Sequence, residues 1–372
     1  MRTLLLVLLS AGAATAADRP AYSPKRLALV RQITNVDAAP NGKEAFFVTD
    51  ITGAMELWSV PANGGWPTQL TDLSEQVVAV DISPNGNDVI LASDYGGDEH
   101  PDLFLLPAAG GPAENITKST RAETSPVFSP DGKRVAFIAD PGEPFVFQLF
   151  VMDLATREET QLTRETVNVF FPVWSPDGKM LAATRTGDDR AGDLVLVSAD
   201  GRMIEYGEPP FKGGIVIPQS WSPDGKSLLT VAEDERGFHR LYLIGDGGKG
   251  RFIGPSGWDV EHADWHKTAG IVFTRNESGA SALYRLRSPG AKLERLTPTK
   301  GRIEGFALDR AGRFAFYDWS DSSRAPDAWR LELATGKRVQ LTRSMLGGVK
   351  AEELAKGEII TYKSFDGKDI SA

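Results

Sequence analysis

The hexapeptide Trp174-Ser175-Pro176-Asp177-Gly178-Lys179 sets the fold of this 372-residue chain, because copies of it recur at a regular spacing. The same six residues stand at 221–226, and 128–133 has Phe in place of Trp. Looser copies occur at 39–43, 82–86, 265–270 and 308–312. The glycines of the seven copies are residues 42, 86, 132, 178, 225, 270 and 312, at intervals of 44, 46, 46, 47, 45 and 42 residues. This period of about 45 residues is typical of the four-stranded blades of a β-propeller.

Each copy predicts a tight hairpin turn between two strands. Proline presets the backbone of the first central turn residue, and glycine supplies the positive φ that closes the turn. Short apolar runs such as Val135–Ile138 flank the turns and have the length of strands. A second repeated motif, the dipeptide Leu-Thr or a degraded form of it, ends each unit; the hexapeptide and this dipeptide are called the two marks. The dipeptide copies are Leu70-Thr71, Ile116-Thr117, Leu162-Thr163, Tyr206-Gly207, Ile253-Gly254, Leu296-Thr297 and Leu341-Thr342.

The two marks together predict an all-β protein, a seven-bladed β-propeller of four-stranded antiparallel blades over residues 32–342. The expected blades are 32–71, 72–117, 118–163, 164–207, 208–254, 255–297 and 298–342. Every unit keeps its four strands in chain order, which predicts an unclasped ring with no strand shared between the first and last blades. An even number of strands per blade also predicts that the chain enters and leaves the ring on one face. One aromatic residue per mark is expected in the core between blades, at Phe128, Trp174, Trp221 and Trp265.

The composition is that of a globular protein, with 41% hydrophobic and 24% charged residues. The formal net charge is −9 and there is no basic patch, so nucleic acid is not an expected partner. The absence of cysteine excludes thiol chemistry and disulfide bonds.

The first 17 residues resemble an export signal. Arg2 precedes an apolar run from Leu4 to Leu9, and small residues follow up to Ala17. The alternative is a membrane anchor, but the run is shorter than the roughly 20 residues that a span requires. The expectation is a signal peptide at 1–17, an extension at 18–31, a periplasmic or secreted protein, and no membrane contact after cleavage.

The repeating sequence pattern ends after Thr342. Residues 358–370 are predicted to form an apolar strand, a turn with Asp366-Gly367, and the start of another strand. Residues 343–372 are therefore expected to be a linker and the beginning of a further domain.

This junction resembles that of the prolyl oligopeptidase family of serine peptidases, especially the acylaminoacyl-peptidase and dipeptidyl-peptidase branches. The residues that carry the resemblance are the last blade, 326–336 and 340–342, together with 360–367. The resemblance implies an unclasped propeller over an α/β-hydrolase domain, with the propeller limiting access to short peptides. It also implies a Ser-Asp-His triad whose serine stands in a G-x-S-x-G turn. These 372 residues contain no such turn, so no catalytic residue is assigned and the hydrolase domain is expected beyond Ala372.

The candidate substrate-binding residues are Glu123, Glu261, His262 and Glu304. Glutamates recur near the start of the innermost strand of several blades, where they would lie near the channel mouth, at Glu75, Glu123, Glu165, Glu261 and Glu304. Carboxylates there could pair with a peptide N-terminus; the alternative is a solvated rim. Strand alternation would place His262, Asp264 and His266 on one face, as a metal site or as the polar wall of a channel. No metal and no cofactor is assigned.

Two functions remain open. The first is the gating and substrate-selecting propeller of an exported serine peptidase for short peptides, with its own C-terminal α/β-hydrolase domain as partner. The second is a non-catalytic periplasmic binding propeller similar to that of the Tol system.

Overall fold

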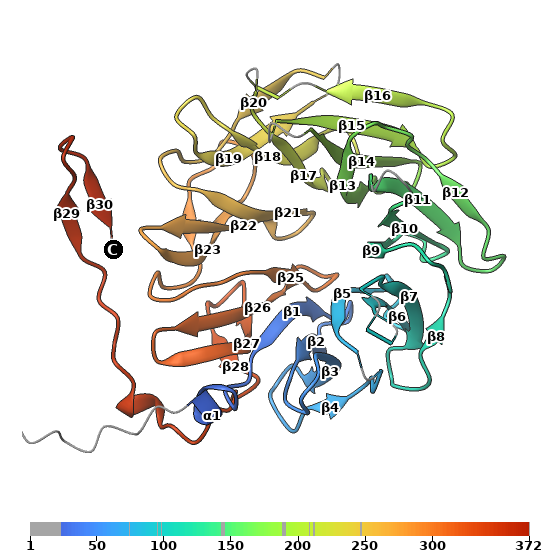
Figure 1. The fold of residues 1–372 in the computed structure, drawn as a ribbon. Coiled ribbons are helices and arrows are strands. Elements are labelled where there is room, and N and C mark those ends of the chain that lie inside the picture. The colour runs from blue at the N-terminus through green and yellow to red at the C-terminus, as the bar shows by residue number, and fades with distance from the viewer. Residues whose placement is uncertain are drawn as a thin grey trace, which may run out of the picture.

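The computed structural model describes residues 24–371, apart from 74, 95, 98, 143–145, 188–190, 208, 211–212 and 246–247. Seven sheets of four antiparallel strands are arranged around a central channel (Figure 1). The predicted all-β, seven-bladed propeller is thereby confirmed. The predicted signal peptide and residues 18–23 of the extension lie outside the described residues. Within the described ranges, no helix has the length and hydrophobicity needed to cross a membrane.

The strands follow one another outward from the channel in every blade (Figure 1). Blades 1 to 3 are built from β1 (Ile33–Ala38), β2 (Glu44–Thr49), β3 (Glu56–Pro61), β4 (Thr68–Gln69), β5 (Val77–Ile82), β6 (Asp88–Ser93), β7 (Asp102–Pro107), β8 (Glu114–Asn115), β9 (Glu123–Phe128), β10 (Arg134–Ala139), β11 (Gln148–Asp153) and β12 (Glu159–Gln161). Blades 4 and 5 are built from β13 (Asn168–Trp174), β14 (Met180–Thr186), β15 (Gly192–Ser198), β16 (Ile204–Gly207), β17 (Val216–Trp221), β18 (Leu228–Glu233), β19 (His239–Ile244) and β20 (Gly250–Phe252). Blades 6 and 7 are built from β21 (Val260–His266), β22 (Gly270–Glu277), β23 (Ala280–Leu286), β24 (Glu294–Arg295), β25 (Phe306–Leu308), β26 (Phe314–Asp321), β27 (Arg324–Glu332) and β28 (Arg338–Gln340).

The repeated hexapeptide forms the turn between the first two strands of a blade. In blade 3, Gly132 has φ 71° and its N–H donates to the carbonyl of Ser129 at 2.8 Å. The hydroxyl of Ser129 donates to Asp131 at 2.6 Å and accepts the N–H of Arg134 at 3.0 Å. The serine of the mark therefore closes the turn together with the aspartate, a role that the sequence pattern alone did not reveal.

The core lies between blades rather than within them. Seven clusters of buried apolar side chains each join two neighbouring blades. The aromatic residue of the hexapeptide takes part, as predicted. The indole N–H groups of Trp174 and Trp221 donate to the carbonyls of Val127 and Val173, each in the preceding blade, at 3.1 and 3.3 Å. Every blade is therefore stabilised by both neighbours, which explains why a ring of small sheets can be stable.

The ring closes without a shared strand, as predicted. Ile33, Phe47 and other apolar residues of blade 1 form one buried cluster with Phe316 and Ala328 of blade 7. On the face of the hexapeptide turns, the N–H of Arg310 donates to the carbonyl of Pro40 at 3.0 Å. Side-chain packing and a few hydrogen bonds thus perform the closure that a common strand performs in clasped propellers.

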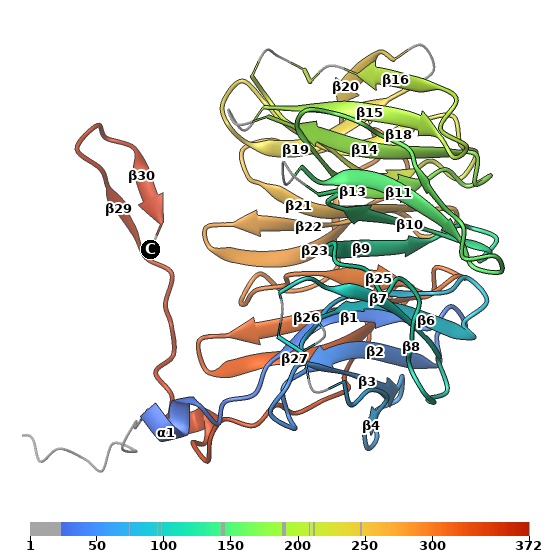
Figure 2. The same ribbon diagram turned by 45° about the vertical axis from the view of Figure 1, so that its right-hand side comes forward.

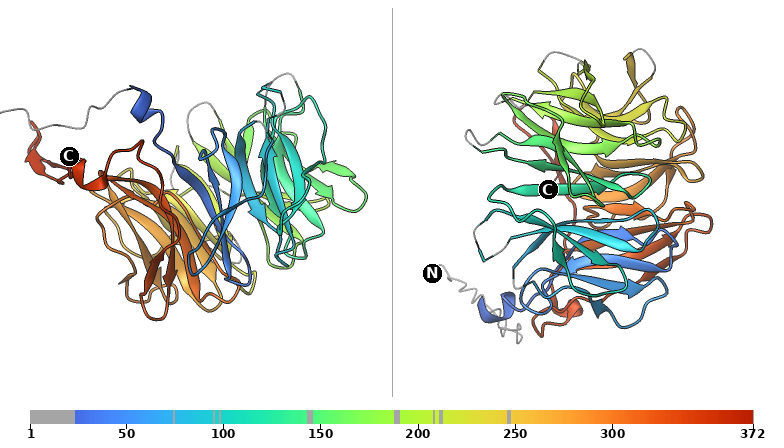
Figure 3. Two further views of the ribbon diagram at one scale, coloured as in Figure 1. Left: turned by 90° about the horizontal axis from the view of Figure 1, so that it is seen from below. Right: turned by 90° about the vertical axis from the view of Figure 1, so that its right-hand side faces the viewer.

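Both ends of the described chain lie on one face (Figures 2 and 3). Val30, which follows the short helix α1 (Pro24–Leu27), forms a β-bridge with Leu346, and the N–H of Arg31 donates to the carbonyl of Met345 at 2.9 Å. Arg31 also pairs with Asp50 in the loop between β2 and β3 at 3.4 Å, so that loop opens on the same face. The expectation from strand parity is confirmed.

Beyond Leu346 the chain forms a short 3₁₀-helix, η1 (Ala351–Glu353), and a hairpin of β29 (Thr361–Lys363) and β30 (Asp369–Ser371). The predicted strand–turn–strand is confirmed. The hairpin stands away from the propeller (Figure 1), and Phe365 at its tip is fully exposed. Its assignment to a hydrolase domain stays a prediction.

In blades 1, 2, 3 and 7 the Leu-Thr mark helps to join the blade to the segment that follows it. Thr342 Oγ1 accepts the N–H of Ala328 at 2.9 Å and donates to Asp327 at 2.8 Å. Asp327 in turn accepts the N–H of Ser344 at 2.7 Å. A polar residue at the start of the third strand has the same role in other blades, at Glu56, Asp102 and Gln148.

Candidate functional site

The channel contains a cavity of about 500 Å³ near blades 5, 6, 7, 1 and 2. Strands β1, β5, β17, β21, β25 and β26 and the segment before β25 line it. Its titratable groups are Asp37, His262, Asp264, Glu304 and Asp318. Four of these five groups are acids, so the cavity is suited to a cationic group.

The structure brings together two of the four predicted binding residues. His262 and Glu304 both line the cavity. Glu261 does not line the cavity, and its carboxylate accepts the side-chain amide of Asn276 at 3.4 Å.

Glu123 lies outside the cavity and is fully buried at the start of β9. Its carboxylate accepts hydrogen bonds from Ser119 at 2.5 Å and from Arg121 at 3.2 Å. Burial raises the pKa of Glu123 to about 7, against the effect of these partners. Glu123 therefore belongs to the packing between strands, since in this conformation a ligand in the cavity has no access to it.

The alternation of β21 is interrupted at its start and is regular from Ala263 to His266. The pairing of β21 with β22 shifts between Val260 and Ala263, and this bulge brings His262, Ala263 and Asp264 together at the cavity wall. His266 instead closes the next turn, because its Nδ1 accepts the N–H of Thr268 at 3.0 Å. His266 does not line the cavity, and the expectation that His262, Asp264 and His266 share one face stays a prediction.

The aspartates of the channel occupy equivalent places in different blades. Asp37, Asp81 and Asp264 each stand three residues before the proline position of the turn, in blades 1, 2 and 6. Valines occupy this place in blades 3 and 4, at Val127 and Val173. Together with Asp318 of blade 7, these three aspartates form the acidic arc, a band of carboxyl groups over four consecutive blades. Aligning the seven units by their turns would have found three of its four members.

Burial governs the ionisation of the acidic arc. It raises the pKa of Asp37 and of Asp318 to about 6, and it raises the pKa of Asp264. Two backbone N–H groups, of Glu304 and Gly305, donate to Asp318 at 3.1 and 2.8 Å and partly oppose that effect. Burial lowers the pKa of His262. At pH 7 Asp37 and Asp318 are therefore mostly ionised and His262 is neutral, and these two carboxylates lose their negative charge below about pH 6.

Asp81 provides a direct test of this electrostatic description. Burial and the neighbouring Asp37 raise its pKa to about 7, although Phe128 N–H donates to it at 2.6 Å. Because the folded state retains the proton, this carboxyl lowers stability as pH rises from its ordinary pKa of 3.8 through about 7. Asp81→Asn keeps an acceptor for Phe128. We expect it to raise the free energy of unfolding by about 1–2 kcal/mol at pH 8, with little change at pH 4.

Urea unfolding of both proteins at the two pH values measures this difference. Asp200→Asn is the matched control, because Asp200 is exposed and hydrogen bonding from Ser198 lowers its pKa. A gain at pH 8 in the control, or none in Asp81→Asn, would contradict a buried, poorly ionised Asp81.

Within the described residues, no group of three or more His, Asp or Glu side chains has the geometry of a metal site. The absence of a metal and of a cofactor stays a prediction.

Comparison with known proteins agrees with the fold. Residues 26–206 match the model of the TolB beta propeller domain. No curated protein matches the chain in sequence. Among solved structures, it is similar to puromycin hydrolase, with 18% identity and a TM-score of 0.74 over 94% of this chain and 60% of that one. A puromycin-hydrolyzing peptidase from Mycobacterium tuberculosis gives 14% identity and a TM-score of 0.73 over 94% and 59%.

Prolyl oligopeptidase B from Galerina marginata is also similar, with 12% identity and a TM-score of 0.72 over 93% of this chain and 56% of that one. The present chain thus spans only somewhat more than half the length of these peptidases. The family resemblance stated from the sequence is confirmed at the level of the fold. The chain is a β-propeller with the fold of the propeller domains of prolyl oligopeptidases and puromycin-hydrolysing peptidases.

Proposed function

We propose that this chain is the gating and substrate-selecting propeller of an exported serine peptidase that hydrolyses short peptides. The acidic arc carries the proposal. Three of its four carboxyl groups, those of Asp37, Asp264 and Asp318, line the cavity together with Glu304. The equivalent places in blades 3 and 4 hold Val127 and Val173. A short peptide offers a cationic amino group at one end and apolar side chains beyond it, which matches this distribution. The cavity of about 500 Å³ has the size of a small-ligand site.

Binding of short peptides tests this proposal. We expect an unblocked tripeptide to bind more tightly than its N-acetylated form. Glu304→Gln should weaken binding of the unblocked peptide about tenfold, which corresponds to a loss of about 1.4 kcal/mol of binding free energy. Glu261→Gln is the matched control, because Glu261 has the same place before the turn in blade 6 as Glu304 has in blade 7 but does not line the cavity. Isothermal titration calorimetry measures the binding of both peptides to the parent protein and to the two variants. Equal binding of the two peptides to the parent would refute recognition of the amine.

The pH dependence has a definite sign. Asp37 and Asp318 lose their protons around pH 6, whereas a peptide amino group stays mostly cationic up to about pH 7.7. Affinity for the unblocked peptide should therefore rise from pH 5 to pH 7, and affinity for the acetylated peptide should change little. A falling or flat profile for the unblocked peptide would contradict the role of these carboxylates.

The catalytic part of the proposal concerns a further domain. The expected α/β-hydrolase domain would supply the serine in a G-x-S-x-G turn, and the 372 residues by themselves should not hydrolyse peptides. Sequencing the gene beyond the codon for Ala372 tests for that turn. A screen of aminoacyl and dipeptidyl chromogenic substrates on the full-length product would then give the specificity.

Export is part of the same proposal and is supported by the pattern of residues 1–17. Fractionation of cells that express the gene, followed by N-terminal sequencing of the product, would test it. A mature protein that begins near Ala17 or Asp18 in the periplasm or medium is expected; retention of Met1 in the cytoplasm would contradict it.

The alternative is a non-catalytic binding propeller. The match of residues 26–206 to the TolB beta propeller domain favours it to the extent that this domain also occurs without a peptidase. A reading frame that stops shortly after Ala372 would support this alternative over the peptidase.

A further inference from the structure

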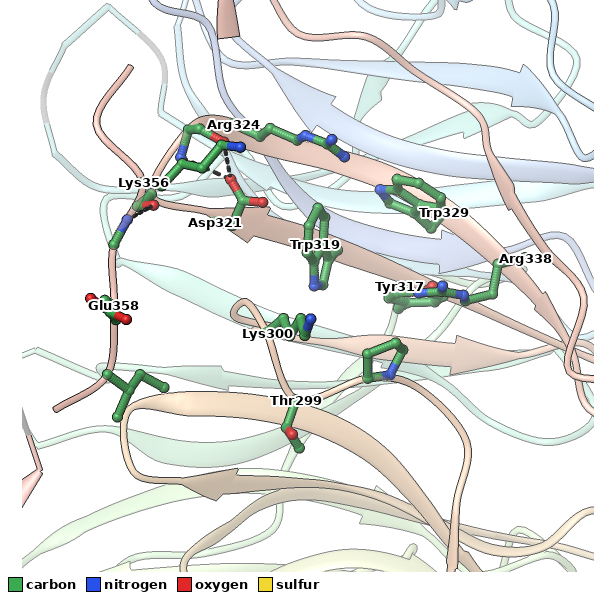
Figure 4. Close-up of a pocket in the computed structure, with 15 residues that line it drawn as sticks. Thr299, Lys300, Tyr317, Trp319, Asp321, Arg324, Trp329, Arg338, Lys356 and Glu358 are labelled. Atoms are coloured by element: carbon green, nitrogen blue, oxygen red, sulfur yellow. Dashed lines mark hydrogen bonds between the residues drawn. The ribbon is translucent and has the colours of Figure 1, made fainter. Parts of the chain in front are cut away.

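A second cavity, of about 690 Å³, lies between blade 7, the connection from blade 6 and the segment that leaves the propeller. Blade 7 contributes β26, β27 and β28, the connection between blades 6 and 7 contributes residues 298–300, and the outgoing chain contributes residues 356–359 (Figure 4). We call it the exit cleft. It shares no lining residue with the channel cavity.

The centre of the exit cleft is aromatic. The rings of Trp319 and Trp329 meet edge to face, with centroids 5.8 Å apart. The indole N–H of Trp329 is buried and has no hydrogen-bond partner. Tyr317 lies deeper and is 1% exposed. A flat apolar group could lie against these rings, and an acceptor on it could bond the free N–H of Trp329.

The rim of the exit cleft is cationic. Four basic side chains line it, against the two acids Asp321 and Glu358; the basic residues are Lys300, Arg324, Arg338 and Lys356. In the described part of the chain, none of these four forms an ion pair with a carboxylate. Arg324 stacks over Trp319 at 5.6 Å, and Figure 4 shows Arg324 and Lys300 on opposite sides of that ring. This excess of unpaired positive charge is unusual in a chain of net charge −9.

We propose that the exit cleft is a binding site for a small aromatic carboxylate. The rings of Trp319 and Trp329 would hold the apolar body of the ligand, and the positive charges of Lys300 and Arg324, which flank the Trp319 ring, would attract its carboxylate. The volume of about 690 Å³ suits a small molecule. Unpaired cations around an aromatic floor distinguish this site from the channel cavity, which is acidic and suited to a cation.

Occupation of the exit cleft would also act on the chain that leaves the propeller. The described contacts include a single hydrogen bond from residues 354–360 to the propeller, from Gly357 N–H to Ser322 Oγ at 2.6 Å. Lys356 lies at the cleft wall in this segment. A bound carboxylate between Lys356 and blade 7 would hold the segment in place and slow its digestion by trypsin.

The probe for the experiment is 1-naphthoate, with the neutral 1-naphthylmethanol as its analogue. Binding is measured by calorimetry, and cleavage after Lys356 is followed by mass spectrometry during limited trypsin digestion. The test variant is Lys300→Met/Arg324→Met, in which both side chains are exposed and the substitutions leave the core intact. The control variant is Arg251→Met/Lys292→Met, which removes two exposed cations outside the exit cleft.

We expect 1-naphthoate to bind the parent protein and the control variant at least tenfold more tightly than it binds the test variant. It should bind the parent protein at least tenfold more tightly than the alcohol does. It should also slow cleavage after Lys356 in the parent but not in the test variant. Equal binding of acid and alcohol, or unchanged binding by the test variant, would overturn the proposal. So would protection of Lys356 that persists in the test variant.

Discussion

Replacing Phe316 by alanine is expected to lower the free energy of unfolding by about 3–5 kcal/mol. Phe316 is 0% exposed and belongs to the apolar cluster that joins blade 7 to blade 1. In an unclasped ring this cluster carries the closure, since no strand is shared by the two blades. Truncation would remove the apolar contacts of the phenyl side chain and leave a cavity between blades 7 and 1.

Urea unfolding followed by tryptophan fluorescence measures the loss. Phe365→Ala is the matched control, because the same side chain is 104% exposed at the tip of the C-terminal hairpin and should change stability little. A loss below about 1 kcal/mol for Phe316→Ala would mean that closure depends on something other than this cluster.

Most of the fold could be predicted from the sequence, because each blade repeats the same local chemistry. Gly132 supplies a positive φ of 71°, and the Leu-Thr mark ends each blade 26 to 30 residues after the turn glycine. Blades with degraded marks still fold alike. In blade 6, His266 accepts turn N–H groups in place of a serine, and Asp309 does so in blade 7. Which side chain accepts the turn N–H groups depends on local backbone geometry, and the spacing of the repeats in the sequence does not reveal that geometry.

The candidate site was predicted less completely. Glu304 was chosen because it lies near the start of an inner strand, and His262 because it belongs to the cluster with Asp264 and His266. Both line the cavity. Glu123 has a similar position in sequence, yet Ser119 and Arg121 hold it in the packing. The difference arises from side-chain direction, which a bulge or one hydrogen-bond partner can change. Asp318 was missed because it lies on β26, the second strand of blade 7, and not on an innermost strand. Its carboxylate lies at the cavity wall, where it accepts the backbone N–H groups of Glu304 and Gly305.

Asp327 holds the chain where it leaves the propeller. It is 6% exposed and accepts hydrogen bonds from Thr342, from the N–H and hydroxyl of Ser344, and from Gln340. Asp327→Ala would leave several of these donors buried without an acceptor. The expected cost is about 2–4 kcal/mol of unfolding free energy, with faster trypsin cleavage after Arg343.

Asp327→Asn separates the loss of the acceptor from the loss of the charge. Blade 3 performs the same task with the neutral Gln148, whose carbonyl oxygen accepts Glu165 N–H at 2.8 Å and Thr163 Oγ1 at 2.9 Å. Burial also raises the pKa of Asp327, so its charge does not stabilise the fold. Asp327→Asn should therefore stay within about 1 kcal/mol of the parent in urea unfolding. If it were as damaging as Asp327→Ala, the anchor would depend on charge, and blade 3 would need another explanation.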